Sequence, residues 1–428
     1  MDTGTTAYML IATALVLLMT PGLAFFYGGL VRAKSVVSMM MMSFGAIGLI
    51  AVLWVLYGYA IAFSTIGPDT YHGLDGFWAI DTANLGLNGL LTTPDGTALT
   101  PLAFAAFQAT FAIITVALIS GAIADRAKFW SWMLFAGIWA TVVYFPVASW
   151  VFNFGLDADT GAFSYGGWAT YGLQQLWGQG VIDFAGGTAV HINAGAAALA
   201  LALVLGKRVG FSKGMSAPHN PPFVLLGAGL LWFGWFGFNA GSELAPDNTA
   251  SIAFINTLVA PAAALLAWIV VEKIKDGKST SVGAASGAVA GLVAITPACG
   301  SLHPIWAILL GIIAGAVCAL AIDLKFKLGF DDSLDVVGVH LVGGLVGTLY
   351  LGFFANNVGV FMPGGSWKQL GVQALVAFSV LIYSFVLAFA IGWIIEKTIG
   401  FRIKNEDELA GVDLVVHGEE GYILADAK

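Results

Sequence analysis

The chain has 428 residues, of which 59% are hydrophobic and only 10% are charged, and its formal net charge is −8. Soluble domains carry about 25% charged residues, so the composition excludes an ordinary soluble protein and requires lipid to cover much of the surface. There is no basic run to suggest a nucleic-acid partner, and the two cysteines, Cys299 and Cys318, show no metal-ligand spacing.

Long apolar stretches divide the chain and predict an all-α polytopic membrane protein with eleven transmembrane helices, each about 20 residues or longer. In chain order the predicted spans lie near 7–31, 36–64, 101–124, 129–153, 184–205, 222–240, 250–271, 280–298, 303–322, 334–356 and 369–396. The first is interpreted as a retained span and not a signal peptide, because Arg32 and Lys34 follow it and no basic residue precedes it.

The basic residues of the loops predict how the spans are oriented. Of the 17 Lys and Arg residues, 16 follow odd-numbered spans or lie in the tail, and only Lys368 falls on the other side. By the positive-inside rule these loops are cytoplasmic. We therefore expect a multi-pass protein of the plasma (cytoplasmic) membrane with its N-terminus outside, its C-terminus cytoplasmic and an odd number of spans.

The two long loops on the predicted outer side, 65–100 and 154–183, contain no Lys or Arg. Their acidic residues are Asp69, Asp75, Asp81, Asp95, Asp157, Asp159 and Asp183. An acidic face raises the local concentration of cations, so these loops favour a cationic substrate. The alternative is that they are only solvated loop residues.

Two short segments resemble each other and indicate an internal repeat. Residues 190–195 and 339–344 both begin Val-His and end in Gly, and aspartates lie upstream of them, at Asp183 and Asp335. Two units of five spans must be inserted in opposite directions, as in transporters with inverted repeats. We expect repeat one over about 7–205, repeat two over about 222–356, and an added eleventh helix over about 369–396.

Two of the six histidines, His191 and His340, fall inside predicted spans, about 10 Å from opposite membrane faces at 1.5 Å per residue. Both therefore lie near the centre of the membrane, where the pseudo-two-fold axis of the repeats brings them together. The alternative role is a pair of helix-bridging hydrogen bonds. The other four, at the positions His72, His219, His303 and His417, fall in loops or at helix ends, where solvation explains them.

A histidine pair inside an apolar lumen limits what can pass. Two neutral imidazoles can share one proton and present their remaining nitrogens to a small hydrogen-bonding solute. The residues around them are mainly Gly, Ala, Val, Leu and Phe, and such a lumen penalises a naked cation. The pattern therefore favours a passenger that loses its charge at the pore mouth, or a proton relay, over a metal ion.

Several motifs together resemble the ammonium transporter family (Amt/Mep/Rh), and its bacterial Amt branch in particular. The resemblance runs from the first span to the tail. The stretches that carry it are 25–30, 183–193, 206–208, 234–242, 296–300 and 335–340.

The resemblance implies roles for single residues in the pore. His191 and His340 are similar to the family's paired pore histidines. Phe111 and Phe238 resemble the two rings that gate the outer entrance, with Phe107 one helical turn from Phe111. The alternative for each phenylalanine is ordinary packing.

At the mouth, Ser242 resembles the hydroxyl that accepts a hydrogen bond from external ammonium, and Asp183 the buried carboxylate that orders the entrance. Ser242 can also be a helix cap, and the position of Asp183 favours an N-cap of the fifth span. The family usually has a tryptophan at the end of span four, where this sequence has Phe152. Trp150 lies two residues away and would face differently on a helix.

The resemblance also implies a homotrimer with one pore per subunit and a PII-type regulatory partner at the cytoplasmic face. We expect a transmembrane domain over 1–400 and a cytoplasmic tail over 401–428, within which 411–422 resembles the family's tail. Ammonium and ammonia are the implied substrates, and no cofactor and no enzymatic reaction is expected.

The expected function is conduction of ammonium or ammonia through a hydrophobic pore with paired histidines. Ammonium gathers at the acidic, aromatic mouth, gives up its proton near the gate and crosses as ammonia; the proton stays outside or travels separately. Three alternatives remain. They are an ammonium sensor of the same fold with little transport, a redox protein with haem held by two intramembrane histidines, and a proton-coupled solute carrier.

Overall fold

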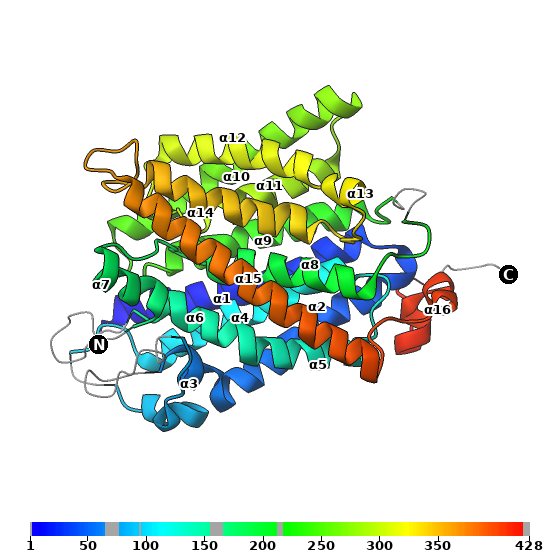
Figure 1. Ribbon diagram of the computed structural model, residues 1–428, viewed down its shortest axis with the longest axis horizontal. Helices are drawn as coiled ribbons and strands as arrows, with labels where there is room; N and C mark the ends of the chain where they lie inside the picture. Colours follow the sequence, from blue (N-terminus) through cyan, green and yellow to red (C-terminus); the bar gives the residue numbers. More distant parts are fainter. Residues whose placement is uncertain (1, 65–76, 94–95, 155–165, 212–216, 423–428) are drawn as a thin grey trace.

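The computed structural model describes residues 2–64, 77–93, 96–154, 166–211 and 217–422. These residues form helices joined by loops, with no β-strand among them (Figure 1). The α-helices are α1 (Thr3–Leu30), α2 (Val36–Leu53), α3 (Tyr59–Ala62), α4 (Pro101–Ile119), α5 (Phe129–Trp139), α6 (Phe145–Phe152), α7 (Leu173–Trp177), α8 (Asn193–Leu205), α9 (Pro221–Gly241), α10 (Asn248–Asp276), α11 (Ser281–Ile295), α12 (Pro304–Ala321), α13 (Leu324–Leu328), α14 (Val342–Phe354), α15 (Trp367–Thr398) and α16 (Asn405–Ala410).

Ten helical segments in the described residues are long and apolar enough to cross a membrane, and each coincides with a predicted span. They are Thr3–Leu30, Ala33–Ala62, Pro101–Ile123, Phe129–Phe152, Gly187–Leu205, Pro221–Gly241, Asn248–Asp276, Pro304–Leu328, Val337–Phe354 and Trp367–Thr398. The remaining predicted span, 280–298, corresponds to α11, a shorter apolar helix of 15 residues. The count of eleven and the orientation of the termini stay predictions.

Large apolar side chains cover the outside of the bundle. On α15, for example, Ile382 is 59% exposed and Trp393 is 50% exposed, and Phe233 on α9 is 58% exposed. Water would make such a surface costly, whereas lipid tails cover it at no cost. Together with the ten apolar spans, this surface identifies a multi-pass membrane protein.

The first helix of each predicted repeat, α1 and α9, packs closely along its partner. Glycines make this contact possible: an added Cβ at Gly227 would lie 2.2 Å from the backbone nitrogen of Phe26, and one at Gly234 would lie 2.4 Å from Met19. Small residues let membrane helices approach in this way. The close crossing brings the inner faces of α1 and α9 to the centre of the bundle.

Four of the spans contain a π-helical segment, in which the backbone bonds run from residue i to i+5. They are η2 (Trp54–Gly58), η5 (Ala140–Tyr144), η7 (Gly187–Ile192) and η9 (Val337–Leu341). Such segments are rare and are frequent at functional sites. Two of them, η7 and η9, carry His191 and His340.

The C-terminal segment folds back onto one end of the bundle, here called the tail end, where α16 lies (Figure 1). The Asp413 carboxylate accepts hydrogen bonds from the backbone N–H groups of Val37 and Ser38 at the start of α2, at 3.0 and 2.8 Å. Glu408, fully buried, accepts from the backbone N–H of Val209, in the loop after α8, at 2.8 Å. These contacts fix the tail against the loops that join the spans.

Candidate pore site

The fifth span begins at a carboxylate that caps it. The oxygens of Asp183 accept backbone hydrogen bonds from Gly186, Gly187, Thr188 and Ala189, at 2.5–3.2 Å, and a further bond from the Thr188 hydroxyl. These are the orphan N–H groups of a helix start. The chain reaches this geometry through Gly186, whose φ of +117° a side chain would strain. Asp183 therefore has the capping contacts that its position favoured.

The tenth span begins at a different aspartate from the one paired with Asp183 in the sequence. The carboxylate of Asp332 accepts from the N–H groups of Val336 and Val337, at 3.1 and 2.7 Å. Asp335, at φ +63°, instead forms an ion pair with Lys325 at 2.5 Å. The repeat-related partner of Asp183 is thus Asp332, and pairing it with Asp335 was wrong. The signal was in the spacing, because Asp183 and Asp332 each precede a pore histidine by eight residues.

The two histidines meet at the centre of the bundle. The Nδ1 atoms of His191 and His340 lie 3.2 Å apart, and the rings are nearly parallel with centroids 5.3 Å apart. Both side chains are buried, at 1% and 3% exposed. The expectation that the repeat brings these rings together is confirmed.

The hydrogen bond between the two Nδ1 atoms determines which hydrogen-bonding groups the two rings present to the pore. One Nδ1 carries the proton and the other accepts it, so one ring presents Nε2 as an acceptor and the other presents Nε2–H as a donor. Within the described part of the chain, Nε2 of His191 has no hydrogen-bond partner although it is buried. A buried polar atom of this kind is costly unless a passing molecule or water bonds it.

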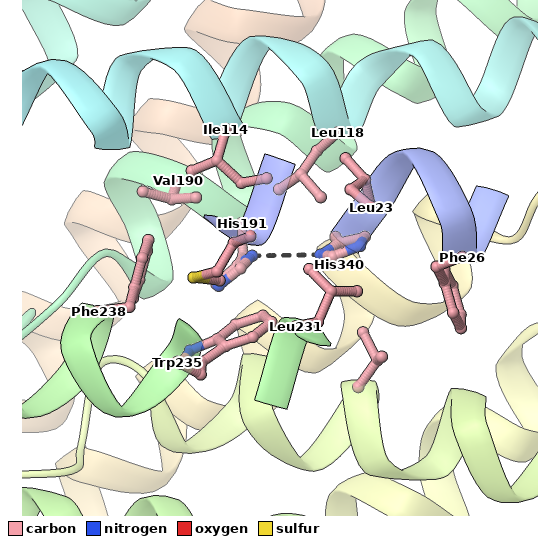
Figure 2. A pocket seen from close by; sticks show the side chains of 12 residues that line it. Leu23, Phe26, Ile114, Leu118, Val190, His191, Leu231, Trp235, Phe238 and His340 are labelled. Carbon is pink, nitrogen blue, oxygen red and sulfur yellow. Dashed lines mark hydrogen bonds between the residues drawn. The ribbon is translucent and has the colours of Figure 1, made fainter. Parts of the chain in front are cut away.

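A narrow cavity runs beside the two rings (Figure 2). Its volume is about 10 Å³, which is room for the centre of roughly one water-sized molecule. The lining is apolar apart from the histidines and the indole nitrogen: Met19, Leu23, Phe26, Ile114, Leu118, Val190, His191, Leu231, Trp235, Phe238, Val289 and His340. Figure 2 shows Phe238 and Phe26 on opposite sides of the histidine pair.

Aromatic rings close one end of this cavity, here called the Phe238 end. The rings of Phe111 and Phe238 stack with centroids 4.1 Å apart, and Phe107 lies 4.9 Å from Phe111. The edge of Phe152 faces Phe111 at 6.2 Å. The predicted gate residues are therefore neighbours, and Phe152 packs onto the gate. An opening here requires the stacked pair to move.

Trp150 points away from the gate, as its position on the helix predicted. Its indole nitrogen donates to the carbonyl of Phe77 at 2.6 Å, and its ring lies 4.7 Å from that of Tyr383. It is therefore not a substitute for the family tryptophan. Phe152 is the aromatic side chain of α6 that contacts the gate.

Ser242 follows the last residue of α9, near the stacked rings. Its hydroxyl donates to the carbonyl of Phe238, four residues earlier, at 2.8 Å, and the side chain is half-buried. A hydroxyl that donates in this way keeps its oxygen lone pairs as acceptors. Ser242 can therefore cap the helix and still accept a bond from a cation at the mouth.

Trp235 belongs to the pore lining and lies within the motif 234–242, although no role was predicted for it. Its ring stacks on His191, with centroids 5.5 Å apart and planes at 20°. The indole nitrogen donates to the Thr296 hydroxyl at 2.8 Å, which holds the ring in place. Stacked on an imidazole, this fixed indole limits how far His191 can rotate.

A network of buried charges lies at the tail end of the bundle. The Arg208 guanidinium bonds Asp331 at 2.9 Å and Asp125 at 3.0 Å. Burial opposes the charge of Arg208, but Asp331 outweighs it and raises the pKa of the guanidinium. Arg126, fully buried, donates to Ser333 and to the Asp331 carbonyl; burial lowers its pKa to about 10. The network fixes the chain that leads to Asp332, whose pKa burial and Asp335 raise to about 6.

Part of the predicted acidic outer face lies outside the described residues, namely Asp69, Asp75, Asp95, Asp157 and Asp159. The same holds for the position His72. Asp81 is described, and its carboxylate caps the short helix after it by accepting from the backbone N–H of Ala83 at 3.0 Å. No group of three or more His, Cys, Asp or Glu side chains suited to a metal ion occurs in the segments that the structure describes.

The fold and the site define a polytopic membrane protein with a narrow apolar pore and a histidine pair at its centre. The model of the Ammonium Transporter Family matches residues 7–422. An ammonium transporter of Mycobacterium bovis is 54% identical, over 100% of this chain and 91% of the relative. The chain therefore belongs to the ammonium transporter family, as the motifs predicted, and is a multi-pass protein of the plasma membrane.

Solved structures support the same assignment. The crystal structure of Saccharomyces cerevisiae Mep2 is similar with a TM-score of 0.81 and 32% identity, over 100% of this chain and 93% of Mep2. A structure named as a sensor Amt protein has a TM-score of 0.85 at 28% identity, over 97% of this chain and 98% of that one. The fold is thus shared across the length of these proteins.

Proposed function

We propose that this protein conducts ammonium across the plasma membrane, with ammonia as the species that crosses the centre of the pore. The observation that carries the proposal is the pair His191 and His340, in contact at 3.2 Å and lining an apolar cavity of about one water-sized molecule. A cation of any kind is strongly penalised there. Ammonia fits because it is small, uncharged and both donates and accepts hydrogen bonds.

Recruitment takes place at the Phe238 end. We assign Phe152, Phe111 and Ser242 to ammonium binding: the rings supply cation–π contacts and the hydroxyl oxygen accepts an N–H bond, which together replace part of the ion's water shell. Asp183 orders this mouth by capping the fifth span. Its oxygens are occupied by five donors of its own helix start, so its role is structural and it does not bind the ion directly.

The gate is assigned to Phe111 and Phe238, with Phe107 behind them. Ammonium gives up its proton at this point because the lumen beyond contains no counter-charge; the proton either stays outside on water at the mouth or travels separately along the imidazoles. Ammonia then bonds the imidazole Nε2 atoms in turn. Potassium has a similar size but no proton to lose, so it cannot follow. Selectivity therefore comes from the loss of charge and not from the diameter of the pore.

For the topology we propose eleven spans, with the N-terminus outside and the C-terminal tail in the cytoplasm. Support comes from the alternation of basic loops and from the capping carboxylates Asp183 and Asp332, each eight residues before a pore histidine at the start of spans five and ten. In this scheme α11 is the eighth span, residues 1–400 form two inverted five-span repeats plus α15, and 401–428 form the tail.

We further propose a homotrimer with one pore per subunit and a PII-type regulatory protein as the cytoplasmic partner. Both proposals follow from the family to which the chain belongs. The docked tail supports the second, because Asp413 bonds the start of α2 and Glu408 bonds the backbone N–H of Val209 in the loop after α8. The protein moves its substrate and catalyses no reaction on it, so we assign no enzymatic activity and no cofactor.

The test is ion flux through purified protein in liposomes. Wild-type vesicles should show saturable ammonium flux above protein-free vesicles and no potassium flux under the same gradient. Ammonium binding without flux would overturn the proposal in favour of a sensor, and equal potassium and ammonium flux would overturn the deprotonation step. An absorption spectrum without a Soret band dismisses the haem alternative in the same sample.

A further inference from the structure

Helix α15 belongs to neither predicted repeat, yet it carries a buried glutamine with every hydrogen-bonding position used. Gln373 is 0% exposed. Its Oε1 accepts from the backbone N–H of Ile182 at 2.8 Å and from Gln369 at 3.0 Å. Its Nε2 donates to the carbonyls of Ile182 at 2.8 Å and Thr348 at 3.1 Å. A side-chain amide accepts two bonds and donates two, so the set is complete.

Three of these bonds, two to Ile182 and one to Thr348, join two parts of the chain that hold the pore histidines, and the fourth stays within α15. Ile182 directly precedes Asp183, the carboxylate that caps η7 and so sets the start of the His191 helix. Thr348 lies on α14, eight residues after His340. One amide therefore spans the gap between the segment that leads into span five and the helix that continues span ten. Figure 1 shows α15 as a diagonal band across the bundle, and it packs on α8 and α14.

Spans five and ten cross at glycines, and a contact of this kind needs an additional restraint such as the Gln373 hydrogen bonds. An added Cβ at Gly195 would lie 2.6 Å from Leu341, and one at Gly344 would lie 3.1 Å from the carbonyl oxygen of Gly187. Close backbone contact brings the imidazoles together, but it offers few side chains that interlock against sliding. A hydrogen-bonded clamp at fixed length supplies that restraint.

A second hydrogen bond from α15 holds span five. The hydroxyl of Ser384 donates to the carbonyl of Asn193 at 2.8 Å. Span five is thus held by α15 on both sides of His191, at Ile182 and at Asn193. Only the Gln373 tie also reaches span ten.

We propose that Gln373 is a positioning residue for the histidine pair: it clamps Ile182 to Thr348 and so sets the separation of the two imidazoles. It contacts neither histidine and acts through the backbone of both spans. Of the two measurements that test this, ammonium flux rests on the proposed function, whereas the distance between the His191 and His340 Nδ1 atoms does not.

The matched variants are Gln373→Leu and Gln369→Leu. Both replace a buried glutamine on the same helix with an apolar side chain of similar size. Gln369 is 2% exposed, and among the residues that the structure describes its amide bonds the Gly180 carbonyl and Gln373. Its loss therefore leaves the link to α14 intact. If Gln373→Leu yields no folded protein, Gln373→Glu replaces it, because it keeps the length and an acceptor but lacks both donors.

Two measurements are made on each variant reconstituted in vesicles or nanodiscs. For Gln373→Leu we expect ammonium flux per folded protein to fall about tenfold, the usual order for outer partners of a site, and the Nδ1 atoms of His191 and His340 to move beyond hydrogen-bonding distance in an experimental structure. Gln369→Leu should stay close to wild type in both.

The proposal is overturned if Gln373→Leu keeps the imidazole contact, or if both variants lose flux equally while that contact is unchanged. Absence of flux in the wild type would instead contradict the proposed function. In that case the imidazole separation still decides whether Gln373 positions the pair.

Discussion

The starts of spans five and ten use the same device in two different surroundings. In each, an aspartate caps a π-helical segment whose histidine lies eight residues further on. Asp183 is surrounded by five donors of its own helix start, and the chain before it is held by a neutral amide from α15. Asp332 accepts only two backbone bonds, and the chain before it is held by buried arginines.

This difference shows that two equivalent pore histidines can be held in place by different kinds of contact. In the proposed function the Phe238 end attracts a cation, and the Asp183 carboxylate nearby is occupied by donors of its own helix start. At the tail end, buried ion pairs link the spans to the loops where the tail docks. We expect loss of charge to be most damaging at span ten and loss of backbone capping to be most damaging at span five.

The largest effect is expected for Arg208→Leu, which tests the span-ten support. It leaves the carboxylates of Asp331 and Asp125, at most 5% exposed, without their main ionic partner. Removing one member of a buried ion pair costs about 3–5 kcal/mol. Thermal unfolding of the purified protein should show a large fall in midpoint, whereas the exposed neighbour Lys207→Leu should change little. An equal fall in both variants would contradict the account.

A smaller but clear contrast is expected between Asp183→Ala and Asp332→Ala. The first leaves four backbone donors and a hydroxyl unpaired, which should cost roughly 3 kcal/mol or more, and the second leaves two backbone donors, about 1–2 kcal/mol. Thermal midpoints and ammonium flux measured side by side check the order. A larger fall in thermal midpoint for Asp332→Ala would mean that the number of capping bonds does not explain the difference between the two spans.

Phe152→Trp sharpens the comparison at the Phe238 end. Phe152 lies beside the start of span five, since an added Cβ at Gly186 would be 3.5 Å from its ring. Trp is the better cation–π partner, and a gain of roughly 0.5 kcal/mol corresponds to about a twofold lower half-saturation concentration for ammonium. Flux at saturation should not change. A change in maximal flux without a change in half-saturation would place Phe152 in the gate only.

The smallest effect concerns pH. Glu243 follows Ser242, and burial together with Asp247 raises the pKa of its carboxyl to about 7. A carboxyl whose pKa is higher in the folded state than in the unfolded state contributes its full stabilisation at pH values below the unfolded-state pKa. It loses that contribution as pH rises through its folded-state pKa of about 7. The thermal midpoint of the wild type should therefore fall slightly between mildly acidic and mildly basic pH. Glu243→Gln should flatten this dependence, and an unchanged slope would contradict it.

The sequence predicted what depends on local pattern and on symmetry. Apolar length located the ten spans found in the described residues, and the repeat predicted that His191 and His340 meet. The pairing of Asp183 with Asp335 was wrong although the sequence contains the signal for Asp332, namely the same spacing of eight residues to the pore histidine. The length of α11 also escaped prediction, since the apolar pattern continues through the turn after Ile295.

Contacts between distant segments were the part that the sequence could not supply. Trp235 stacks on His191 although α9 and η7 are distant in the chain, and Gln373 bonds Ile182 from α15, which packs on α8 and α14. Neither residue belongs to a motif with its partner. From the sequence, Arg126 and Arg208 are only cytoplasmic loop charges. The fold shows that Arg126 is buried and donates to the Asp331 carbonyl, and that Arg208 forms ion pairs with Asp331 and Asp125.

The central claim is that two imidazoles in an apolar, water-sized passage admit only a neutral hydrogen-bonding molecule. The most direct test measures ammonium and potassium currents in liposomes for the wild type and for the double variant His191→Ala with His340→Ala. We predict potassium exclusion in the wild type, and in the double variant either loss of ammonium flux or entry of potassium. A double variant with wild-type ammonium flux that still excludes potassium would contradict the account.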